Sequence, residues 1–165
     1  MFSIGIITAS DKGSRGERAD MSGKTIAEML AGLGTVKHYV VVPDEQAVIS
    51  REIIYMADEL KIDLILTTGG TGLGPRDVTP EATLAVIDRQ VPGIAEAMRA
   101  KSLEKTSRAM LSRAVAGIRG RTLIINLPGS PKGVRECLEV VLPALEHGLA
   151  IMKGEAGECG SVPAQ

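Results

Sequence analysis

The sequence predicts an α/β protein whose parallel sheet is covered by helices on both faces. Short apolar runs of strand length alternate along the chain with segments whose apolar residues recur at helical spacing. The strand-length runs are apolar throughout rather than at every second residue, which is typical of parallel strands buried on both sides. These two observations fix the fold class that we expect.

The composition indicates one domain without a strong electrostatic field. The chain has 165 residues, 44% of them hydrophobic, which is enough to build a sizeable core. Its 19 basic and 20 acidic residues nearly cancel, so little attraction for nucleic acid or an anionic membrane is available. The aromatic residues Phe2, Tyr39 and Tyr55 are too few for a base-stacking platform. We therefore expect neither nucleic acid nor a membrane as a partner.

The cysteines and the N-terminus favour a cytoplasmic protein. Cys137 and Cys159 lie far apart and do not form a metal-type pair. Cys137 falls on the apolar face of a predicted helix, where a buried thiol in a reducing compartment is the ordinary interpretation. Residues 1–9 are apolar but lack a preceding basic segment, so they predict a strand rather than a signal peptide. No apolar run approaches membrane-spanning length.

The first half of the chain is expected to contain three strands and two helices. The strands are predicted over residues 4–8, 36–42 and 63–67. Ser22 is expected to cap the first helix, which runs to about Leu33. The second helix is predicted from Asp44 to about Leu60, with its apolar residues facing inward.

Prolines mark the helices of the second half. Pro80, Pro92 and Pro131 each stand where a helix is expected to begin, because proline is favoured in the first turn. A further strand is predicted over residues 123–126. The last helix carries an apolar stripe formed by Val134, Cys137, Leu138, Val141, Leu142, Leu145 and Leu149. We expect one domain over residues 1–153 and a short tail, rich in Gly, Glu and Pro, over 154–165.

Segments that could bind a ligand follow the ends of four predicted strands. They are Ser10-Asp11, Pro43-Asp44, residues 68–79 and residues 127–131. Parallel sheets bind ligands at the carboxyl ends of their strands, so these segments are expected to form one site.

The glycine-rich segment over residues 67–80 is the strongest functional signal. Its glycines, Gly69, Gly70, Gly72 and Gly74, allow positive φ and let the backbone approach a ligand closely. Consecutive backbone N–H groups in such a turn form a concave anion site. No Gly-Lys-Ser/Thr follows, and the spacing differs from the dinucleotide fingerprint, so neither common nucleotide motif is present. A tight strand-to-helix turn is the alternative interpretation.

Two acids and several polar side chains near these loops each have two interpretations. Asp77 follows the glycines, where a carboxylate beside an anion site favours an intervening Mg²⁺; a local turn role is the alternative. Asp44 either caps a helix or serves as a ligand. Ser130 either donates to a phosphate at a helix N-terminus or caps that helix. Lys12, Arg15 and Arg18 either contact an anionic substrate or belong to a solvated loop.

Taken together, these segments resemble the molybdopterin adenylyltransferase family and the related G domain of gephyrin. The similarity covers nearly all of the chain, and the combination of motifs is highly specific. The segments that carry it are Thr68–Gly72, Pro75–Glu81, Ala109–Arg113, Pro43-Asp44, Asn126–Pro131, and Ser10-Asp11 with Asp20 and Ser22-Gly23.

The resemblance implies a three-layer αβα sandwich with a mostly parallel central sheet, usually in a homotrimer. It implies transfer of AMP from Mg-ATP to the terminal phosphate of molybdopterin, with release of pyrophosphate. ATP and molybdopterin would be the substrates, and Mg²⁺ would be the cofactor. The resemblance is also compatible with contact with a molybdenum-insertion protein. Asp44 and Asp77 would be catalytic residues and metal ligands. The expected nucleotide- and substrate-binding residues are Ser10, Asp11, Thr68, Gly69, Gly70, Thr71, Gly72, Ser112, Pro128, Gly129 and Ser130.

Two other functions compete with this hypothesis. A non-catalytic pterin-binding or scaffold protein would have the same fold, but the presence of both acids favours the enzyme. A nicotinamide-dependent oxidoreductase would need the dinucleotide fingerprint and an acid suitably placed after it, and both are missing.

Overall fold

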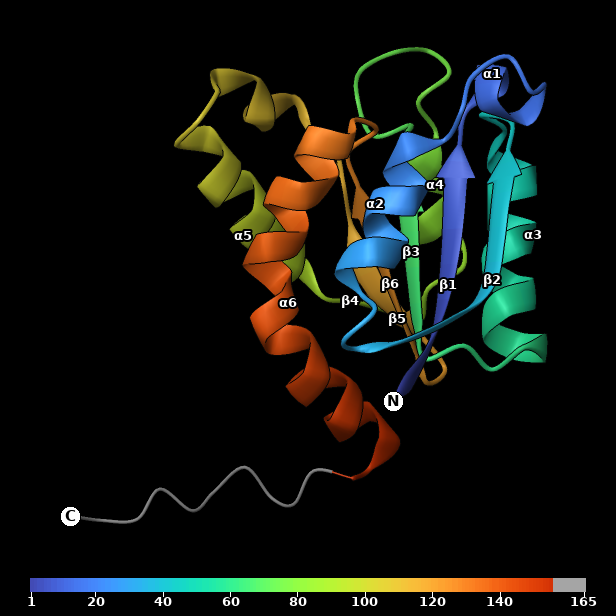
Figure 1. Ribbon diagram of the computed structural model, residues 1–165, viewed down its shortest axis with the longest axis vertical. Helices are drawn as coiled ribbons and strands as arrows, with labels where there is room; N and C mark the ends of the chain where they lie inside the picture. The colour runs from blue at the N-terminus through green and yellow to red at the C-terminus, as the bar shows by residue number, and fades with distance from the viewer. Residues whose placement is uncertain (156–165) are drawn as a thin grey trace.

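A six-stranded sheet lies between two layers of helices in the computed structural model, which describes residues 1–155 (Figure 1). The order of the strands across the sheet is β2-β1-β3-β6-β5-β4. The strands are β1 (Phe2–Ala9), β2 (Gly34–Val42), β3 (Leu64–Thr68), β4 (Arg89–Gln90), β5 (Ala116–Arg119) and β6 (Thr122–Leu127). Strands β2, β1, β3 and β6 are parallel, whereas β5 and β4 are antiparallel to their neighbours. The predicted, mostly parallel α/β sheet is confirmed.

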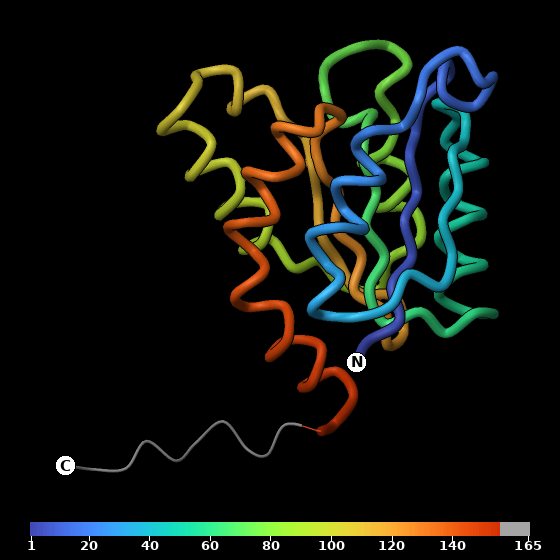
Figure 2. Tube along the Cα trace, in the orientation of Figure 1, coloured from blue at the N-terminus to red at the C-terminus, as the bar shows by residue number. Residues whose placement is uncertain are grey.

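The helices divide into two layers according to the core that each one covers. They are α1 (Asp11–Ser14), α2 (Met21–Met29), α3 (Gln46–Ile54), η1 (Tyr55–Glu59), α4 (Thr79–Leu84), α5 (Pro92–Leu103), η2 (Ser107–Leu111) and α6 (Pro131–Lys153). Helices α2, α5 and α6 pack on one face, and α3, η1 and α4 pack on the other (Figures 1 and 2). No helix within residues 1–155 is long and apolar enough to cross a membrane.

Two predicted helix starts are wrong, and both errors concern the site. Asp20, not Ser22, caps α2, because its carboxylate accepts a hydrogen bond from the Gly23 N–H at 2.9 Å. The next helix, α3, begins at Gln46 after Glu45, so Asp44 caps nothing. Ser22 and Asp44 are thereby free to make contacts with distant parts of the chain.

Helix α6 uses its apolar stripe within the chain. Every stripe residue except Leu142 is buried, and Leu142 is partly buried against the same core. Burial raises the pKa of the Cys137 thiol, as expected for a cysteine in the core. Most of the predicted tail, with Cys159, lies outside the described residues.

The parallel strands bring their carboxyl ends to one edge of the sheet (Figure 2). Four connections meet there: the segment after β1, the segment after β2 that carries Asp44, the glycine loop between β3 and α4, and the turn between β6 and α6. The Gly69 N–H donates to the Leu127 carbonyl at 3.3 Å, which joins the glycine loop to the end of β6. The segments that were predicted to form one ligand site therefore do lie together at this edge of the sheet.

Candidate active site

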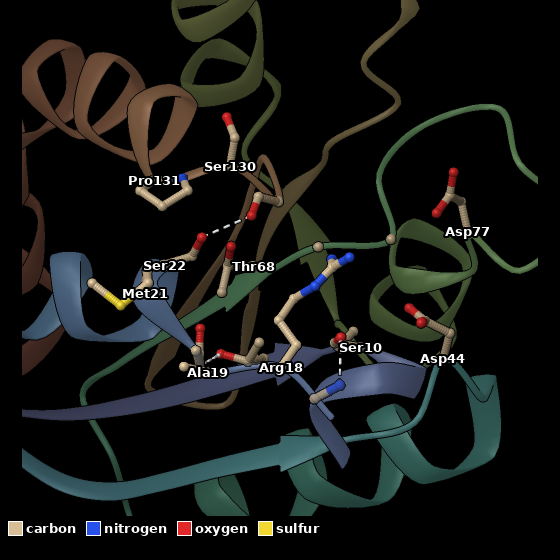
Figure 3. Close-up of a pocket in the computed structure, with 17 residues that line it drawn as sticks. Ser10, Arg18, Ala19, Met21, Ser22, Asp44, Thr68, Asp77, Ser130 and Pro131 are labelled. Carbon is tan, nitrogen blue, oxygen red and sulfur yellow. Dashed lines mark hydrogen bonds between the residues drawn. The ribbon is translucent and has the colours of Figure 1, made fainter. Parts of the chain in front are cut away.

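A cavity of about 680 Å³ opens at this edge of the sheet (Figure 3). We call it the first cavity. It is walled by the loop before α2, the glycine loop (residues 69–78), Asp44 and the turn before α6. The predicted site residues that line it are Ser10, Asp44, Thr68, Gly69, Gly70, Asp77, Gly129 and Ser130.

Asp44 is held by a reciprocal pair of hydrogen bonds with Asp11. Asp44 Oδ2 accepts from the Asp11 N–H at 2.9 Å, and Asp11 Oδ1 accepts from the Asp44 N–H at 3.0 Å. Burial and the neighbouring carboxylates of Asp11 and Asp77 raise the pKa of Asp44. Asp44 therefore presents a partly buried carboxyl group whose negative charge would be stabilised by a cation.

Asp11 does not line the cavity but connects two of its walls. Its carboxylate receives a two-pronged ion pair from Arg76 on the glycine loop, at 3.0 Å from Nε and 2.9 Å from Nη2. The side-chain hydrogen bond from Arg76 lowers the pKa of Asp11. Asp11 thus fixes the first loop against the glycine loop.

Asp77 lines the cavity and also closes a turn within the glycine loop. Its Oδ2 accepts from the Gly74 N–H at 2.9 Å, and a Cβ added at Gly72 or Gly74 would lie 2.9 Å from the same oxygen. A side chain at either position would therefore displace the carboxylate. In Figure 3 the carboxylates of Asp44 and Asp77 lie on the same side of the cavity.

Arg113 holds both ends of the segment that carries Asp77. Its guanidinium donates to the Gly72 carbonyl at 2.8 Å and to the Asp77 carbonyl at 2.6 Å, and it pairs with Glu81. The Arg113 N–H donates to the Thr71 carbonyl at 2.9 Å. One arginine thereby satisfies backbone carbonyls that a glycine-rich loop cannot pair by itself.

The floor of the cavity requires glycine at two successive positions. Gly69 and Gly70 have φ angles of +91° and +68°. A Cβ on Gly70 would collide with the Thr79 hydroxyl and would lie 3.4 Å from Asp44 Oδ1. The Thr79 hydroxyl is buried and has no hydrogen-bond partner among the described residues. A buried hydroxyl without a partner is costly, and this one lies against Gly70 without lining the cavity.

The opposite wall is fixed by side chains from two other elements. Ser22 on α2 donates to the Gly129 carbonyl at 2.7 Å, across 107 residues of sequence. Thr68 at the end of β3 donates to the Pro128 carbonyl at 2.6 Å. Ser130 accepts a hydrogen bond from the Gly133 N–H at 3.0 Å and so caps α6. The cap was one of the two roles predicted for Ser130. The turn before α6 is thus anchored from both sides.

A second cavity of about 330 Å³ adjoins the first, between α5, η2 and α6. Arg99 stands in its wall and donates to the carbonyls of Ser112 and Ala114 at 3.3 and 2.8 Å. Ser130 lines both cavities. The predicted site residues that line the second cavity are Thr71, Gly72, Ser112, Pro128 and Ser130. The predicted site is therefore divided into two neighbouring compartments.

The comparisons with known proteins agree with this architecture. Residues 5–147 match the family model described as a probable molybdopterin binding domain. The chain belongs to this molybdopterin-binding domain family.

Relatives whose names state an activity align with most of the length of this molybdopterin-binding domain. The molybdopterin adenylyltransferase of Helicobacter pylori strain J99 is 48% identical, over 92% of this chain and 88% of the relative. The molybdopterin adenylyltransferase of Escherichia coli K12 is 45% identical, over 88% of this chain and 78% of the relative.

Solved structures have the same fold. The molybdopterin biosynthesis enzyme MoaB of Thermus thermophilus matches with a TM-score of 0.89 and 57% identity, over 96% of this chain and 100% of that one. The Mog protein of Mycobacterium ulcerans matches with a TM-score of 0.85 and 42% identity, over 92% and 99%.

Several residues that shape the site of this molybdopterin-binding domain make contacts that the sequence does not predict. Asp20 accepts hydrogen bonds from Tyr39 and Thr8 in addition to capping α2. Partial burial and the hydrogen bond to Asp20 raise the pKa of Tyr39. The position of Arg113 depends likewise on partners far along the chain. Both Asp20 and Arg113 belong to segments that carry the family resemblance.

Proposed function

We propose that this chain transfers AMP from ATP to the terminal phosphate of molybdopterin and releases pyrophosphate. The observation that carries the proposal is the first cavity, where two carboxylates face a glycine backbone at the carboxyl edge of a parallel sheet. The named activity of relatives at 45–48% identity supports the same reaction.

The two cavities suit two substrates that react where they meet. The first has hydroxyl, carboxylate and guanidinium groups in its wall and the N-terminus of α6 beside it, which favours the phosphate groups of ATP. The second, lined by Ala95, Met98 and Leu111 as well as Ser112, has the mixed wall that a pterin ring requires. The shared residue Ser130 would stand near the reacting phosphates.

Asp44 and Asp77 would hold Mg²⁺ together with the phosphates of ATP. The donor set fits, because Mg²⁺ is commonly bound by one or two carboxylates plus substrate oxygens. Both carboxylates line the first cavity, where a cation would offset the burial and the neighbouring carboxylates that raise the pKa of Asp44. When bound, the ion would neutralise charge on the transferring phosphoryl group.

The residues of the chain would align the reactants rather than remove protons. An oxygen of the molybdopterin phosphate attacks the α-phosphorus of ATP, and the bond from that phosphorus to the β-bridging oxygen breaks. A phosphate monoester has a second pKa of about 6, so the attacking group is already mostly a dianion at neutral pH. No general base is required, and neither His38 nor His147 lines either cavity. Backbone N–H groups of the glycine loop would stabilise the charge that develops.

The proposal also covers the oligomeric state of the enzyme, its compartment and its protein partner. We infer a homotrimer in the cytoplasm. Contact with a molybdenum-insertion protein would place the adenylylated product next to the step that consumes it.

Incubation of the purified chain with ATP, Mg²⁺ and molybdopterin tests the proposal. Mass spectrometry should detect adenylylated molybdopterin, and pyrophosphate should appear in equal amount. Omission of Mg²⁺ should abolish both products. Molybdopterin that is bound without any adenylylated product would contradict the enzyme and favour the scaffold alternative.

A further inference from the structure

The first cavity has an unusual charge balance for a site that binds phosphates. The charged residues of 1–155 that line it are Arg18, Asp20, Asp44 and Asp77. Three of these four side chains are carboxylates, so they repel the anionic substrates of the proposed reaction. Arg18 is the one cationic side chain that lines this cavity within residues 1–155.

The neighbouring arginines are engaged elsewhere. Arg15 forms a two-pronged pair with Glu17 at 2.9 and 3.1 Å, and Arg76 forms one with Asp11. Arg113 is committed to the glycine loop. Arg18 has no hydrogen bond or ion pair with any described residue, so all five of its N–H donors are available.

The backbone around Arg18 is anchored although its side chain is free. Two residues later, Asp20 is fixed by the Gly23 N–H, Tyr39 and Thr8. At the other end of the loop, Ser10 accepts from the Gly13 N–H at 2.9 Å and caps α1. Figure 3 shows the Arg18 side chain pointing into the cavity. An anchored loop that aims a free guanidinium at a cavity is suited to a ligand rather than to an internal contact.

We propose that Arg18 is a substrate-binding residue that pairs with a phosphate group in the first cavity. The planar guanidinium donates two parallel N–H groups to two phosphate oxygens, which lysine cannot do. This inference rests on the proposed function, because the phosphate belongs either to the nucleotide or to the acceptor. It adds a cationic side chain to the positive charge of the Mg²⁺ that Asp44 and Asp77 would hold.

Arg18→Gln tests the proposal, and Arg15→Gln is its matched control. Both changes remove one positive charge from the same loop, but Arg15 does not line the cavity and already has a carboxylate partner. Titration calorimetry would measure the affinity for pyrophosphate and for ATP in the presence of Mg²⁺. We expect Arg18→Gln to weaken binding about ten-fold or more and Arg15→Gln to change it less than about two-fold, with equal thermal melts. Arg18→Lys should fall between the two.

The pattern of losses identifies which phosphate Arg18 holds. If it holds the acceptor, pyrophosphate and ATP affinities stay constant while the KM for molybdopterin rises. The proposal is overturned if all three quantities in Arg18→Gln match those of Arg15→Gln. It is also overturned if the wild-type chain binds none of pyrophosphate, ATP and molybdopterin. A wild type that binds these compounds without turnover would contradict the proposed reaction but leave the role of Arg18 supported by the affinities.

Discussion

Asp44 and Asp77 share the first cavity but are held in different ways. Asp44 is partly buried and exchanges hydrogen bonds with Asp11, whereas Asp77 belongs to a turn that it closes through the Gly74 N–H. In both cases one carboxylate oxygen accepts a backbone hydrogen bond, which fixes the side chain. The other oxygen remains available to a cation, so the two acids would position Mg²⁺ without a costly rearrangement.

Asp77→Asn should separate the metal role from the turn role. The amide oxygen of asparagine can still accept from the Gly74 N–H, so the thermal melt should change little. The lost charge should lower single-turnover formation of adenylylated molybdopterin on the order of 10²-fold, or about 3 kcal/mol. Molybdopterin affinity should change much less. Turnover at the wild-type rate would remove Asp77 from the catalytic residues.

Asp63 should contribute stability that depends on pH. Burial alone would raise its pKa, but hydrogen bonds from the Ser3 N–H at 2.7 Å and hydroxyl at 2.9 Å, with Lys153 at 3.2 Å, lower it overall. A depressed carboxyl pKa stabilises the fold above the unfolded pKa of about 3.9, and that stability is lost as pH falls through the folded pKa.

Asp63→Asn should therefore lower the free energy of unfolding at pH 7 by about 1–2 kcal/mol. The difference from the wild type should shrink below about pH 4, as the wild-type carboxyl becomes protonated. Urea denaturation at several pH values measures both quantities. Glu28→Gln, at an exposed position on α2, serves as the control. A difference that stays constant with pH would show that the charge of Asp63 is irrelevant.

At the scale of elements, the glycine loop is shaped by contacts that arrive from outside it. Arg113 satisfies its carbonyls, Arg76 ties it to the first loop, and Gly69 passes closely over the Ala9 carbonyl at the end of β1. The loop is thus a fixed part of the fold, which favours a preorganised anion site.

Gly69→Ala should destabilise the chain more than Gly16→Ala does. Both glycines have positive φ, at +91° and +74°, which costs an alanine roughly 1–2 kcal/mol. Only at Gly69 would the new methyl group collide with the backbone, adding about 1–3 kcal/mol; nothing lies within 4 Å of it at Gly16. Urea denaturation of both variants measures the difference. Equal losses would contradict the close approach of β1 and the loop.

At the scale of the whole molecule, an apolar surface borders the core that α5 and α6 cover. A groove of about 460 Å³ runs between α5 and α6, and Ile151 in it is 48% exposed. The residues that line the groove include Val91, Ile94, Ala97, Val140, Ala144, Gly148, Ile151 and Met152. The groove meets the apolar stripe of α6 at Val141 and Leu145, although most of the stripe is buried within the chain.

The family resemblance implies a homotrimer. We expect a neighbouring chain of that homotrimer to cover the groove. Light scattering coupled to size exclusion should give three times the chain mass of 17.3 kDa. Ala144→Glu in the groove should shift the mass to that of one chain, whereas Lys132→Glu at the exposed start of α6 should not. A wild type that elutes as a monomer at micromolar concentration would contradict the prediction.

The sequence by itself determined the alternation of strands and helices, because burial on both faces requires continuous apolar runs and helical spacing is local. It also determined that the loops after the parallel strands share one edge. The short antiparallel strands β4 and β5 were not predicted, because two and four residues rich in Arg and Gly carry no strand pattern.

Only the tertiary structure decided what the polar residues of that edge do. Asp44 and Ser22 both stand where a helix cap is plausible, yet Asp44 contacts Asp11 and Ser22 contacts Gly129, 107 residues away. Arg15 and Arg18 are equivalent in the sequence, but one is paired and the other points into the cavity. The physical reason is that periodicity reflects neighbours along the chain, whereas hydrogen-bond partners are chosen by the packing that brings distant segments together.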